Sequence, residues 1–370
     1  SCCMLWPDSY PSLWKRMRPS ILSDSDGDTL IDVIVLRRGK ESKETGVGAY
    51  SDVVGSVLQS SSLSHGEIRF KLTTEDGHAE CLKYGFIEPL LYIINSRSRI
   101  YHATEELCCL FLPFVRGKKV VTFHHVSDSR EGRSRLLYPI WKMAAKIAVS
   151  HSDMIIAISQ QTKEDLIRTY GIDEKKIRVM MHGPAPEFRN LKRSREKTIG
   201  FVGTLIERKN IIGGLRAFKL FTEMPGTEGY RFVICGDGPL RGELESAAAE
   251  LGISERIEFI PRMTKDELIE FYNRISVFAN SSMHEGLGMT ALEAQACGAP
   301  VVFFRDARIP EEVTVNFIPS IDEKDFAENM LRLIKDEEFR NSHLKSVEER
   351  SLEKEYPKAL LNMYSDLLED

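Results

Sequence analysis

EGLGMTALEAQACGAPVV, residues 285–302, places two carboxylates around the start of one predicted helix. Gly-Leu-Gly is a poor helix former and the following Thr-Ala-Leu-Glu-Ala-Gln-Ala a good one, so we expect the helix to begin near Met289. Backbone N–H groups at such a start, behind glycines, bind phosphates well. At 3.6 residues per turn, Glu293 is rotated by roughly 80° from Glu285, so the pair suits different hydroxyls of one elongated ligand better than joint acid/base work.

Short apolar runs alternate with helical patterns along the rest of the chain. This alternation predicts parallel sheets covered by helices, an α/β fold. Most of the runs are continuously apolar, as expected of strands buried on both faces. We expect strands at 31–36, 99–103, 119–124, 154–159 and 177–182 in the first half, and at 198–203, 230–236, 256–260, 276–280 and 299–304 in the second.

The polar, basic stretch NLKRSREK (190–197) separates the two sets of strands. A chain of 370 residues is also longer than a single hydrophobic core usually supports. Open α/β sheets bind ligands beyond the carboxyl ends of their strands, so the natural site is the cleft between two domains. We expect an extension at 1–30, a Rossmann-like domain at 31–190, a second Rossmann-like domain at 191–355 and a C-terminal helix at 356–370.

The C-terminal segment LEKEYPKALLNMYSDLLED (352–370) predicts an amphipathic helix that begins at Pro357. Its apolar face is formed by Leu360, Leu361, Met363, Tyr364 and Leu367.

The first thirty residues show no clear period and no signal-peptide layout, and we expect them to be partly disordered. Asp24, Asp26 and Asp28 mimic the start of a calcium loop. The sixth and twelfth loop positions are Thr29 and Val35 instead of Gly and Glu, so the loop fails. The same aspartates mimic a metal-binding DxD motif, but no apolar strand leads into them. We interpret both matches as chance.

The composition is that of an ordinary globular protein, with 28% charged and 42% hydrophobic residues and a net charge of −5. No apolar run approaches the ~18 residues of a membrane span. The seven cysteines are odd in number and lack CxxC spacing, which favours a reduced cytosolic chain without a disulfide framework or a zinc site.

Two further glycine-containing stretches follow predicted strands. In GFVGTLIERKN (200–210) a strand ends at Gly203, and Arg208 and Lys209 follow in a short loop, two cations suited to phosphate groups. In ETGVGAYSDVV (44–54), Gly46, Val47 and Gly48 precede a predicted helix whose N–H groups could approach phosphates. The GxGxxS form lacks the third glycine of a dinucleotide fingerprint. Taken alone, the cations could be solvated and the glycines a tight turn.

The 285–302 stretch resembles the E-x7-E signature of the retaining glycosyltransferases of family four, which have the GT-B fold. The resemblance covers roughly residues 31–370 and includes GDGP at 236–239. It implies that Glu285 lies near the donor sugar and that Glu293 binds the ribose of the nucleotide. It also implies two Rossmann-like domains facing across a cleft, with the last helix crossing back onto the first domain.

The resemblance gives roles to residues of both domains. His124 ends a predicted strand where the family usually shows His-Asp, and His125 replaces the aspartate. The resemblance implies that His124 binds hydroxyls of the donor sugar or touches the acceptor. The alternative is that His124 has only a structural role. Pro261 replaces the family's usual glycine, which leaves recognition of the base by Arg262 and Met263 open.

The site expected from the resemblance comprises a few catalytic residues and a larger donor-binding set. The catalytic residues are Glu285, His124, Arg208 and Lys209. The donor-binding residues are Gly46, Val47, Gly48, Gly203, Arg208, Lys209, Arg262, Met263, Glu285, Gly286, Leu287, Gly288, Met289 and Glu293. No metal and no cofactor are expected, since the nucleotide-diphosphate sugar is a substrate.

The expected activity is the metal-independent, retaining transfer of a mannose- or glucose-like hexose from a nucleotide-diphosphate sugar to an acceptor hydroxyl. A nucleotide-sugar epimerase would need added acid/base carboxylates, and a glycogen-type phosphorylase a pyridoxal lysine and a longer chain. A non-catalytic nucleotide-sugar-binding partner subunit is the alternative from another class. It is favoured by the departures at His125, His182 (for the family's Asn) and Pro261.

The expected partners are the donor and a carbohydrate or lipid-linked acceptor, without nucleic acid. The segment 129–153 mixes basic residues with Leu, Tyr, Ile and Trp. Such a pattern is more often a helix that covers a sheet, but it could also lie on a membrane surface. We therefore expect a cytoplasmic protein, with the inner face of the membrane as a second location.

Overall fold

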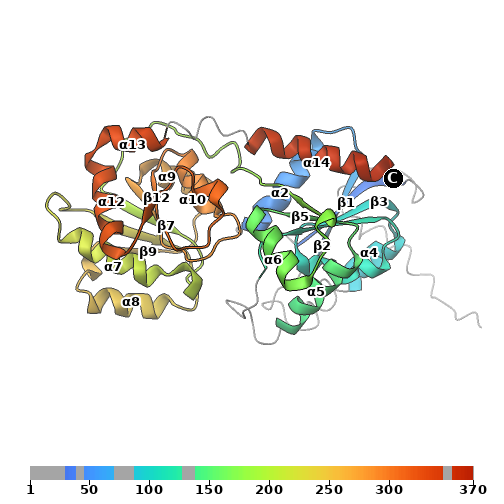
Figure 1. Cartoon of the computed structure of the whole chain (residues 1–370), viewed down its shortest axis with the longest axis horizontal. Coiled ribbons are helices and arrows are strands. Elements are labelled where there is room, and N and C mark those ends of the chain that lie inside the picture. The colour runs from blue at the N-terminus through green and yellow to red at the C-terminus, as the bar shows by residue number, and fades with distance from the viewer. Residues whose placement is uncertain (1–29, 39–45, 71–86, 127–137, 345–351, 370) are drawn as a thin grey trace, which may run out of the picture.

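The computed structural model describes residues 30–38, 46–70, 87–126, 138–344 and 352–369 (Figure 1). Residues 1–29 of the expected 1–30 extension, which include its three aspartates, lie outside these residues. Two α/β domains lie side by side in Figure 1, each built on one parallel sheet. The expected α/β fold with two Rossmann-like domains is confirmed.

The first domain contains a six-stranded sheet in the order β2-β1-β3-β4-β5-β6. Its strands are β1 (Ile31–Arg38), β2 (His65–Phe70), β3 (Ser98–Ala103), β4 (Lys118–Phe123), β5 (Met154–Ala157) and β6 (Ile177–Val179). Its helices are α2 (Gly46–Gln59), α4 (Glu88–Asn95), η3 (Glu106–Phe114), α5 (Tyr138–His151), α6 (Gln160–Tyr170) and η4 (Glu174–Lys176).

The second domain contains a six-stranded sheet in the order β12-β11-β10-β7-β8-β9. Its strands are β7 (Thr198–Val202), β8 (Arg231–Cys235), β9 (Ile257–Ile260), β10 (Val277–Asn280), β11 (Val301–Phe304) and β12 (Ile318–Ser320). Its helices are η5 (Glu207–Lys209), α7 (Ile211–Thr222), α8 (Arg241–Glu250), η6 (Ser254–Arg256), α9 (Lys265–Arg274), α10 (Met289–Ala296), α11 (Glu311–Thr314), α12 (Glu323–Lys335) and α13 (Glu337–Leu344).

The strand order reverses at one point in each sheet, between β1 and β3 in the first domain and between β7 and β10 in the second. Such switch points leave a crevice beyond the carboxyl ends of the strands, where α/β proteins bind ligands. The segments that follow β7 and β10 are 203–210 and 281–288, which carry half of the expected donor-site residues. The topology therefore places the predicted motifs at the correct end of the sheet.

All ten predicted strands are present, and two further strands were missed. β2 lies at the sheet edge, and its residues alternate between buried and partly exposed, so the sequence HGEIRF lacks a continuous apolar run. β12 has only three residues. The predicted start of the helix at Met289 is confirmed, because α10 begins there.

The C-terminal helix α14 (Leu352–Glu369) packs on the first domain, as expected (Figure 1). It begins at Leu352, five residues before the predicted start at Pro357. Leu360, Met363 and Leu367 join a cluster with Val33 of β1 and Val54 of α2.

Polar contacts also join α14 to the first domain. The hydroxyl of Tyr356 donates to that of Tyr50 at 2.8 Å, and Tyr364 Oη lies 2.6 Å from His102 Nδ1. Both partners are fully buried. Because a buried polar group without a partner is costly, these contacts specify where the helix docks as well as stabilising it.

The predicted boundary stretch 190–197 is fixed to the second domain. Arg195 donates to the carbonyls of Tyr272 and Ile275 at the end of α9, at 2.9 and 3.1 Å, and to that of Cys297 after α10 at 3.1 Å. Cations at helix C-termini satisfy unpaired carbonyls and match the helix dipole. This segment is therefore held by the domain that follows it.

The described helices include none that is both long enough and apolar enough to cross a bilayer. The four cysteines among the described residues are buried free thiols.

Candidate functional site

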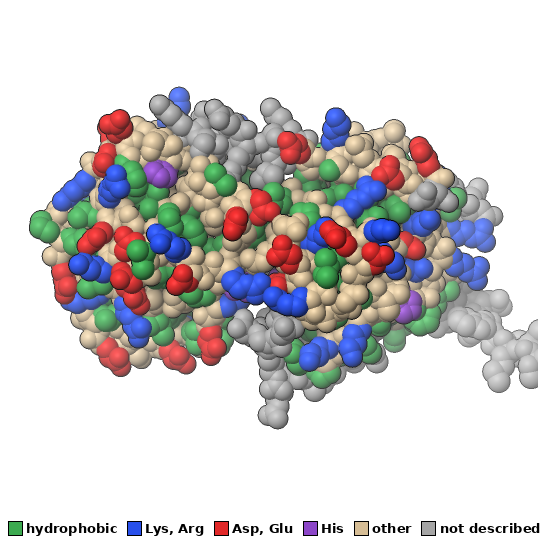
Figure 2. Space-filling model, in the orientation of Figure 1, with side chains coloured by type: hydrophobic (Ala, Val, Ile, Leu, Met, Phe, Trp, Pro, Cys, Tyr) green, Lys and Arg blue, Asp and Glu red, His purple; other side chains and the backbone are tan. Residues whose placement is uncertain are grey.

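The two domains touch at the predicted glycine loop. A Cβ atom added at Gly286 would lie 1.9 Å from the carbonyl oxygen of His124, which follows β4 of the first domain. This spacing admits only glycine without a movement of one backbone. The contact brings the predicted Glu285 and His124 segments together from opposite sheets. On the face drawn in Figure 2, both acidic and basic side chains lie where the domains meet.

Glu285 is buried between two cations. Lys209 Nζ pairs with its Oε1, and Arg208 Nη1 lies 3.2 Å from its Oε2. Burial alone would raise the pKa of Glu285, but the charges of Lys209 and Arg208 outweigh it and lower the pKa to about 2. Glu285 is therefore a fixed anion that accepts hydrogen bonds, and it does not serve as a proton donor near neutral pH.

The two cations are held by η5, directly after β7. Lys209 is buried, and the carbonyl of Lys209 accepts a hydrogen bond from Ser281 Oγ at 2.8 Å. Arg208 is partly exposed and donates to the carbonyl of His284 at 2.8 Å. A Cβ at Gly203 would lie 3.2 Å from Phe201 Cζ and, at an ordinary contact distance, 3.5 Å from Lys209 Cε. Arg208 is thus the cation with access to a ligand, and Lys209 mainly neutralises Glu285.

Helix α10 begins directly beyond Glu285. Gly288 is its N-cap, in the left-handed region at φ 78°, which favours glycine. Leu287 is buried in the hydrophobic core, and Met289 packs against the same core. Any contact of Leu287 with a ligand would therefore involve its backbone. The first N–H groups of α10 remain suited to an anion.

Glu293 lies on the same helix in a different environment. Tyr272 Oη of α9 donates to its Oε2 at 3.3 Å. Burial raises the pKa of Glu293 to about 7, although the bond from Tyr272 opposes the shift. The two glutamates thus differ, one permanently charged and the other close to half protonated near neutral pH.

His124 is buried, and its Nε2 lies 2.9 Å from the carbonyl oxygen of Thr104, which can only accept. Nε2 therefore carries the proton. Burial lowers the pKa of His124 to about 4, although the bond to Thr104 opposes the shift, so the ring is neutral and Nδ1 is an acceptor. Tyr50 packs edge-on against the ring, with centroids 4.9 Å apart.

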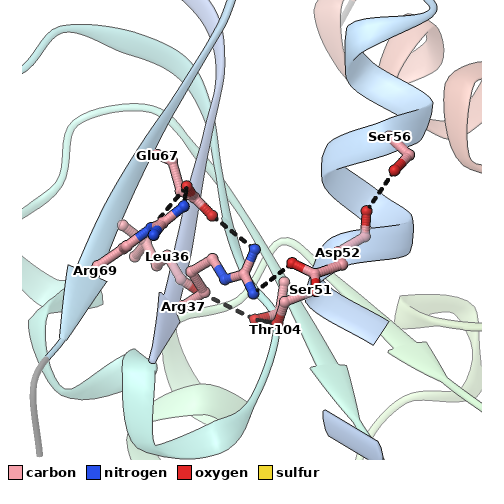
Figure 3. A network of polar contacts seen from close by, with 8 residues as sticks. All are labelled: Leu36, Arg37, Ser51, Asp52, Ser56, Glu67, Arg69 and Thr104. Carbon is pink, nitrogen blue, oxygen red and sulfur yellow. Dashed lines mark hydrogen bonds and ion pairs between the residues drawn. The ribbon is translucent and has the colours of Figure 1, made fainter. Parts of the chain in front are cut away.

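Thr104 is in turn fixed to neighbouring elements (Figure 3). Its hydroxyl lies 2.8 Å from that of Ser51 on α2 and 3.2 Å from the carbonyl of Leu36 on β1. The buried Arg37 spans from Asp52 of α2 to Glu67 of β2, at 2.8 and 2.9 Å. These contacts fix α2 against β1, β2 and the end of β3, where the Thr104 carbonyl accepts the hydrogen bond from His124.

The glycines of the first domain belong to α2 itself. The sequence predicts Gly46, Val47 and Gly48 ahead of a helix, whereas α2 begins at Gly46. All three lie in the first turn of α2. The position therefore differs from the prediction by less than one turn.

Two expected base-binding residues follow β9 of the second domain. Arg262 is exposed and Met263 partly buried, in the segment after β9. Pro261, the departure from the family pattern, accepts a bond from Cys235 Sγ at 3.4 Å through its carbonyl. Nothing among the described contacts joins Arg262 or Met263 to the Glu285 cluster.

His182 is a buried structural residue. Its ring packs against Tyr50 and Tyr356, with centroids 5.1 and 5.9 Å away, and burial lowers its pKa to about 4.

A small hollow beside His125 has an aromatic lining from Phe123, Tyr138, Trp141 and Tyr170. Within the described ranges, no three His, Cys, Asp or Glu side chains are grouped as metal ligands.

Several residues around the site carry no sequence signal. Tyr50, Thr104, Tyr272 and Ser281 act through contacts with partners at least 20 residues away along the chain. They lie in ordinary helix, strand-end or loop contexts, so sequence spacing alone could not single them out.

Comparison with known proteins gives two family models that together cover most of the chain. The model for glycosyl transferases group 1 matches residues 185–350, and the model for Glycosyltransferase Family 4 matches residues 86–187. A D-inositol 3-phosphate glycosyltransferase of Corynebacterium jeikeium is 31% identical over 237 residues, 58% of this chain and 55% of that protein. The O-antigen chain mannosyltransferase RfbU of Salmonella typhimurium is 22% identical over 238 residues, 62% of this chain and 66% of that protein. The chain spans about half the length of the curated relatives it matches.

Solved structures share the fold at lower identity. HepE of Anabaena, crystallised with UDP-glucose, has a TM-score of 0.65 and 14% identity, over 90% of this chain and 100% of that one. Sucrose-phosphate synthase of Thermosynechococcus elongatus has a TM-score of 0.68 and 16% identity, over 91% and 99%. At such identities the likeness concerns the fold alone.

Proposed function

The chain belongs to the group 1 glycosyltransferases of family four, with the GT-B fold, and we propose that it transfers a hexose from a nucleotide-diphosphate sugar to an acceptor hydroxyl. The observation that carries this proposal is the buried Glu285, which lies at the start of α10 between Arg208 and Lys209, beside the His124 segment of the other domain.

The diphosphate of the donor would lie against Arg208 and the N-terminus of α10. Arg208 is the more exposed of the two cations, so it can turn from Glu285 toward a phosphate. The free N–H groups of α10 add partial positive charge at the same place. Together they would stabilise the charge that develops on the leaving group, an effect worth about 10²–10³ in rate per donor.

The hexose would lie between Glu285 and His124. The carboxylate of Glu285 and the unprotonated Nδ1 of His124 are both hydrogen-bond acceptors. They can therefore accept hydrogen bonds from hydroxyl groups of the sugar. Glu293, farther along α10, would bind the ribose. These groups hold the donor at three places along its length, which orients the anomeric carbon toward the first domain.

We infer that the reaction retains the anomeric configuration and needs no metal. Glu285 is engaged by two cations, which makes its carboxylate a poor nucleophile. Attack by the acceptor hydroxyl on the leaving-group side would form the new C1–O bond as the C1–O–phosphate bond breaks. The departing phosphate oxygen would take the acceptor's proton.

The acceptor is proposed to be a carbohydrate or a lipid-linked sugar that approaches from the first domain, in the cytoplasm or at the inner face of the membrane.

Thermal unfolding with UDP, GDP, ADP and their hexose conjugates tests donor binding first. Ligand at about 100 times its dissociation constant stabilises by about 2.7 kcal/mol, so binding shifts the melting temperature visibly. We expect a shift with one nucleotide family, followed by hexose transfer to sugar acceptors. Absence of any shift in a folded sample would contradict the proposal.

A non-catalytic nucleotide-sugar-binding subunit remains the second candidate function, favoured by His125, His182 and Pro261 at positions where the family pattern differs. Its signature would be binding of a nucleotide sugar without transfer or hydrolysis. In an active enzyme, Arg208→Ala should abolish transfer, whereas a binding subunit would show no turnover to lose. Epimerisation would appear as conversion of the free nucleotide sugar without any acceptor.

A further inference from the structure

Helix α6 of the first domain contacts the loop that carries Glu285. We propose that Asp165 and Gln161 of α6 are positioning residues, which hold the Glu285 backbone in place when the two domains are closed. The inference rests on the proposed function, since it concerns the same site. It adds that alignment of Glu285 depends on a polar contact from the opposite domain.

The first contact is an ion pair between the domains. Arg308, in the loop after β11, places Nη2 2.9 Å from Asp165 Oδ1. Asp165 is almost fully buried, with its side chain 3% exposed, whereas Arg308 is 49% exposed. The carboxylate is therefore the fixed member of the pair, and the arginine is the member that can leave.

Gln161 supplies a second contact one turn earlier on α6. Its Nε2 donates to the carbonyl of Glu285 at 3.2 Å, and it lies 3.5 Å from the carbonyl of Arg308. The start of α6 is itself fixed, because Ser159 caps it through a bond from the Thr162 N–H at 3.1 Å. Both contacts thus originate from a rigid helix end.

The loops of Arg308 and Glu285 are joined to each other within the second domain. The N–H of Arg308 donates to the carbonyl of Met283 at 2.8 Å, and the N–H of Glu285 donates to the carbonyl of Arg308 at 3.0 Å. Any displacement of Arg308 is therefore passed to the peptide of Glu285. Gly286, the next residue, contacts the carbonyl of His124.

The ion pair can open at low cost. Arg168, on the first domain itself, also pairs with Asp165 Oδ1, so the buried carboxylate keeps a cation when Arg308 moves away. An unpaired buried carboxylate would be strongly destabilising, and this second partner avoids that state. The contact can therefore break and reform as the domains separate and close.

The test compares Arg308→Gln and Asp165→Asn with Arg168→Gln as the matched control, since Arg168 pairs with the same oxygen without crossing between domains. For Arg308→Gln we expect kcat to fall by about tenfold or more, because misplacement of a reacting group by 1 Å can cost about 10²-fold. The KM for the donor and the affinity for the free nucleotide should change far less. The double variant Arg308→Gln/Asp165→Asn should lose no more kcat than either single variant, because both substitutions remove the same contact.

Small-angle X-ray scattering of the ligand-free protein gives a readout that needs no substrate. Arg308→Gln should increase the radius of gyration, and Arg168→Gln should leave it unchanged. The inference is overturned if Arg308→Gln has the kcat and the radius of gyration of the wild type. It is also overturned if Arg168→Gln lowers kcat as much as Arg308→Gln does. Absence of donor binding in the wild type would instead contradict the proposed function, and scattering would still test the contact. If Asp165→Asn misfolds because Asp165 is buried, Arg308→Gln still tests the inference by itself, since the Arg308 side chain is half-exposed.

Discussion

Gly286 of the second domain lies directly against the carbonyl oxygen of His124 in the first, so close that any Cβ at position 286 would overlap it at 1.9 Å. The domains can therefore reach the observed closure only with glycine at this position. The same contact places Glu285 beside the histidine segment, which links the closed arrangement to the geometry of the proposed site.

Gly286→Ala is expected to hold the domains apart. We predict a fall in kcat of about 10²-fold, since the two halves of the site would no longer align, while nucleotide binding to the second domain persists. Gly242→Ala on α8 is the matched control, because a Cβ there meets nothing within 4 Å. Steady-state kinetics check the prediction, which is wrong if both alanine variants turn over alike.

Lys209→Met should destabilise the second domain. The variant keeps the volume of the side chain but leaves the buried Glu285 with Arg208 as its remaining cation. Loss of one partner of a buried pair typically costs about 3 kcal/mol or more. Urea unfolding at neutral pH measures the effect. Arg231→Gln removes an exposed pair with Glu258 and should barely move the midpoint; equal shifts in the two variants would contradict the prediction.

Local sequence was sufficient for the elements around Glu285. The start of α10 follows from the poor helix propensity of Gly286–Gly288 and the good propensity of the residues after Met289. Strands such as β10 and β11 are buried on both faces and consist mainly of apolar residues. The half-exposed edge strand β2 does not have this composition and was missed.

The contacts that make these residues a site could not be predicted in the same way. Glu285 and Lys209 are 76 residues apart, and Gln161 is 124 residues from Glu285. Spacing placed Lys209 at a strand end and suggested a phosphate as its partner, whereas the structure pairs it with Glu285. Which side chains meet across two sheets depends on how the domains pack, which residue spacing does not encode.

Glu293→Gln should change how stability depends on pH. Burial raises the folded-state pKa of Glu293 from 4.5 to about 7, so the folded state holds a proton that the unfolded state has released between these values. Stability of the wild type therefore falls as pH rises through this window, by up to about 3 kcal/mol from this group. The side chain of the glutamine variant cannot ionise, so this variant should lose less stability as pH rises. Unfolding midpoints across the window check this; parallel curves for the two proteins would refute it.

Arg195→Ala tests whether the segment between the domains is held by helix ends. Arg195 donates to three carbonyls at the ends of α9 and α10, and removing it leaves those acceptors without their charged partner. Since hydrogen bonds to charged groups contribute about 1.5–3 kcal/mol each, we expect a loss of at least about 2 kcal/mol in the free energy of unfolding. Arg193→Ala is the control from the same segment, because Arg193 makes an exposed pair with Glu270 and should contribute little. Urea denaturation of both variants measures the difference. A loss for Arg195→Ala no larger than that for Arg193→Ala would show that the segment is held by its backbone and its neighbours rather than by the guanidinium.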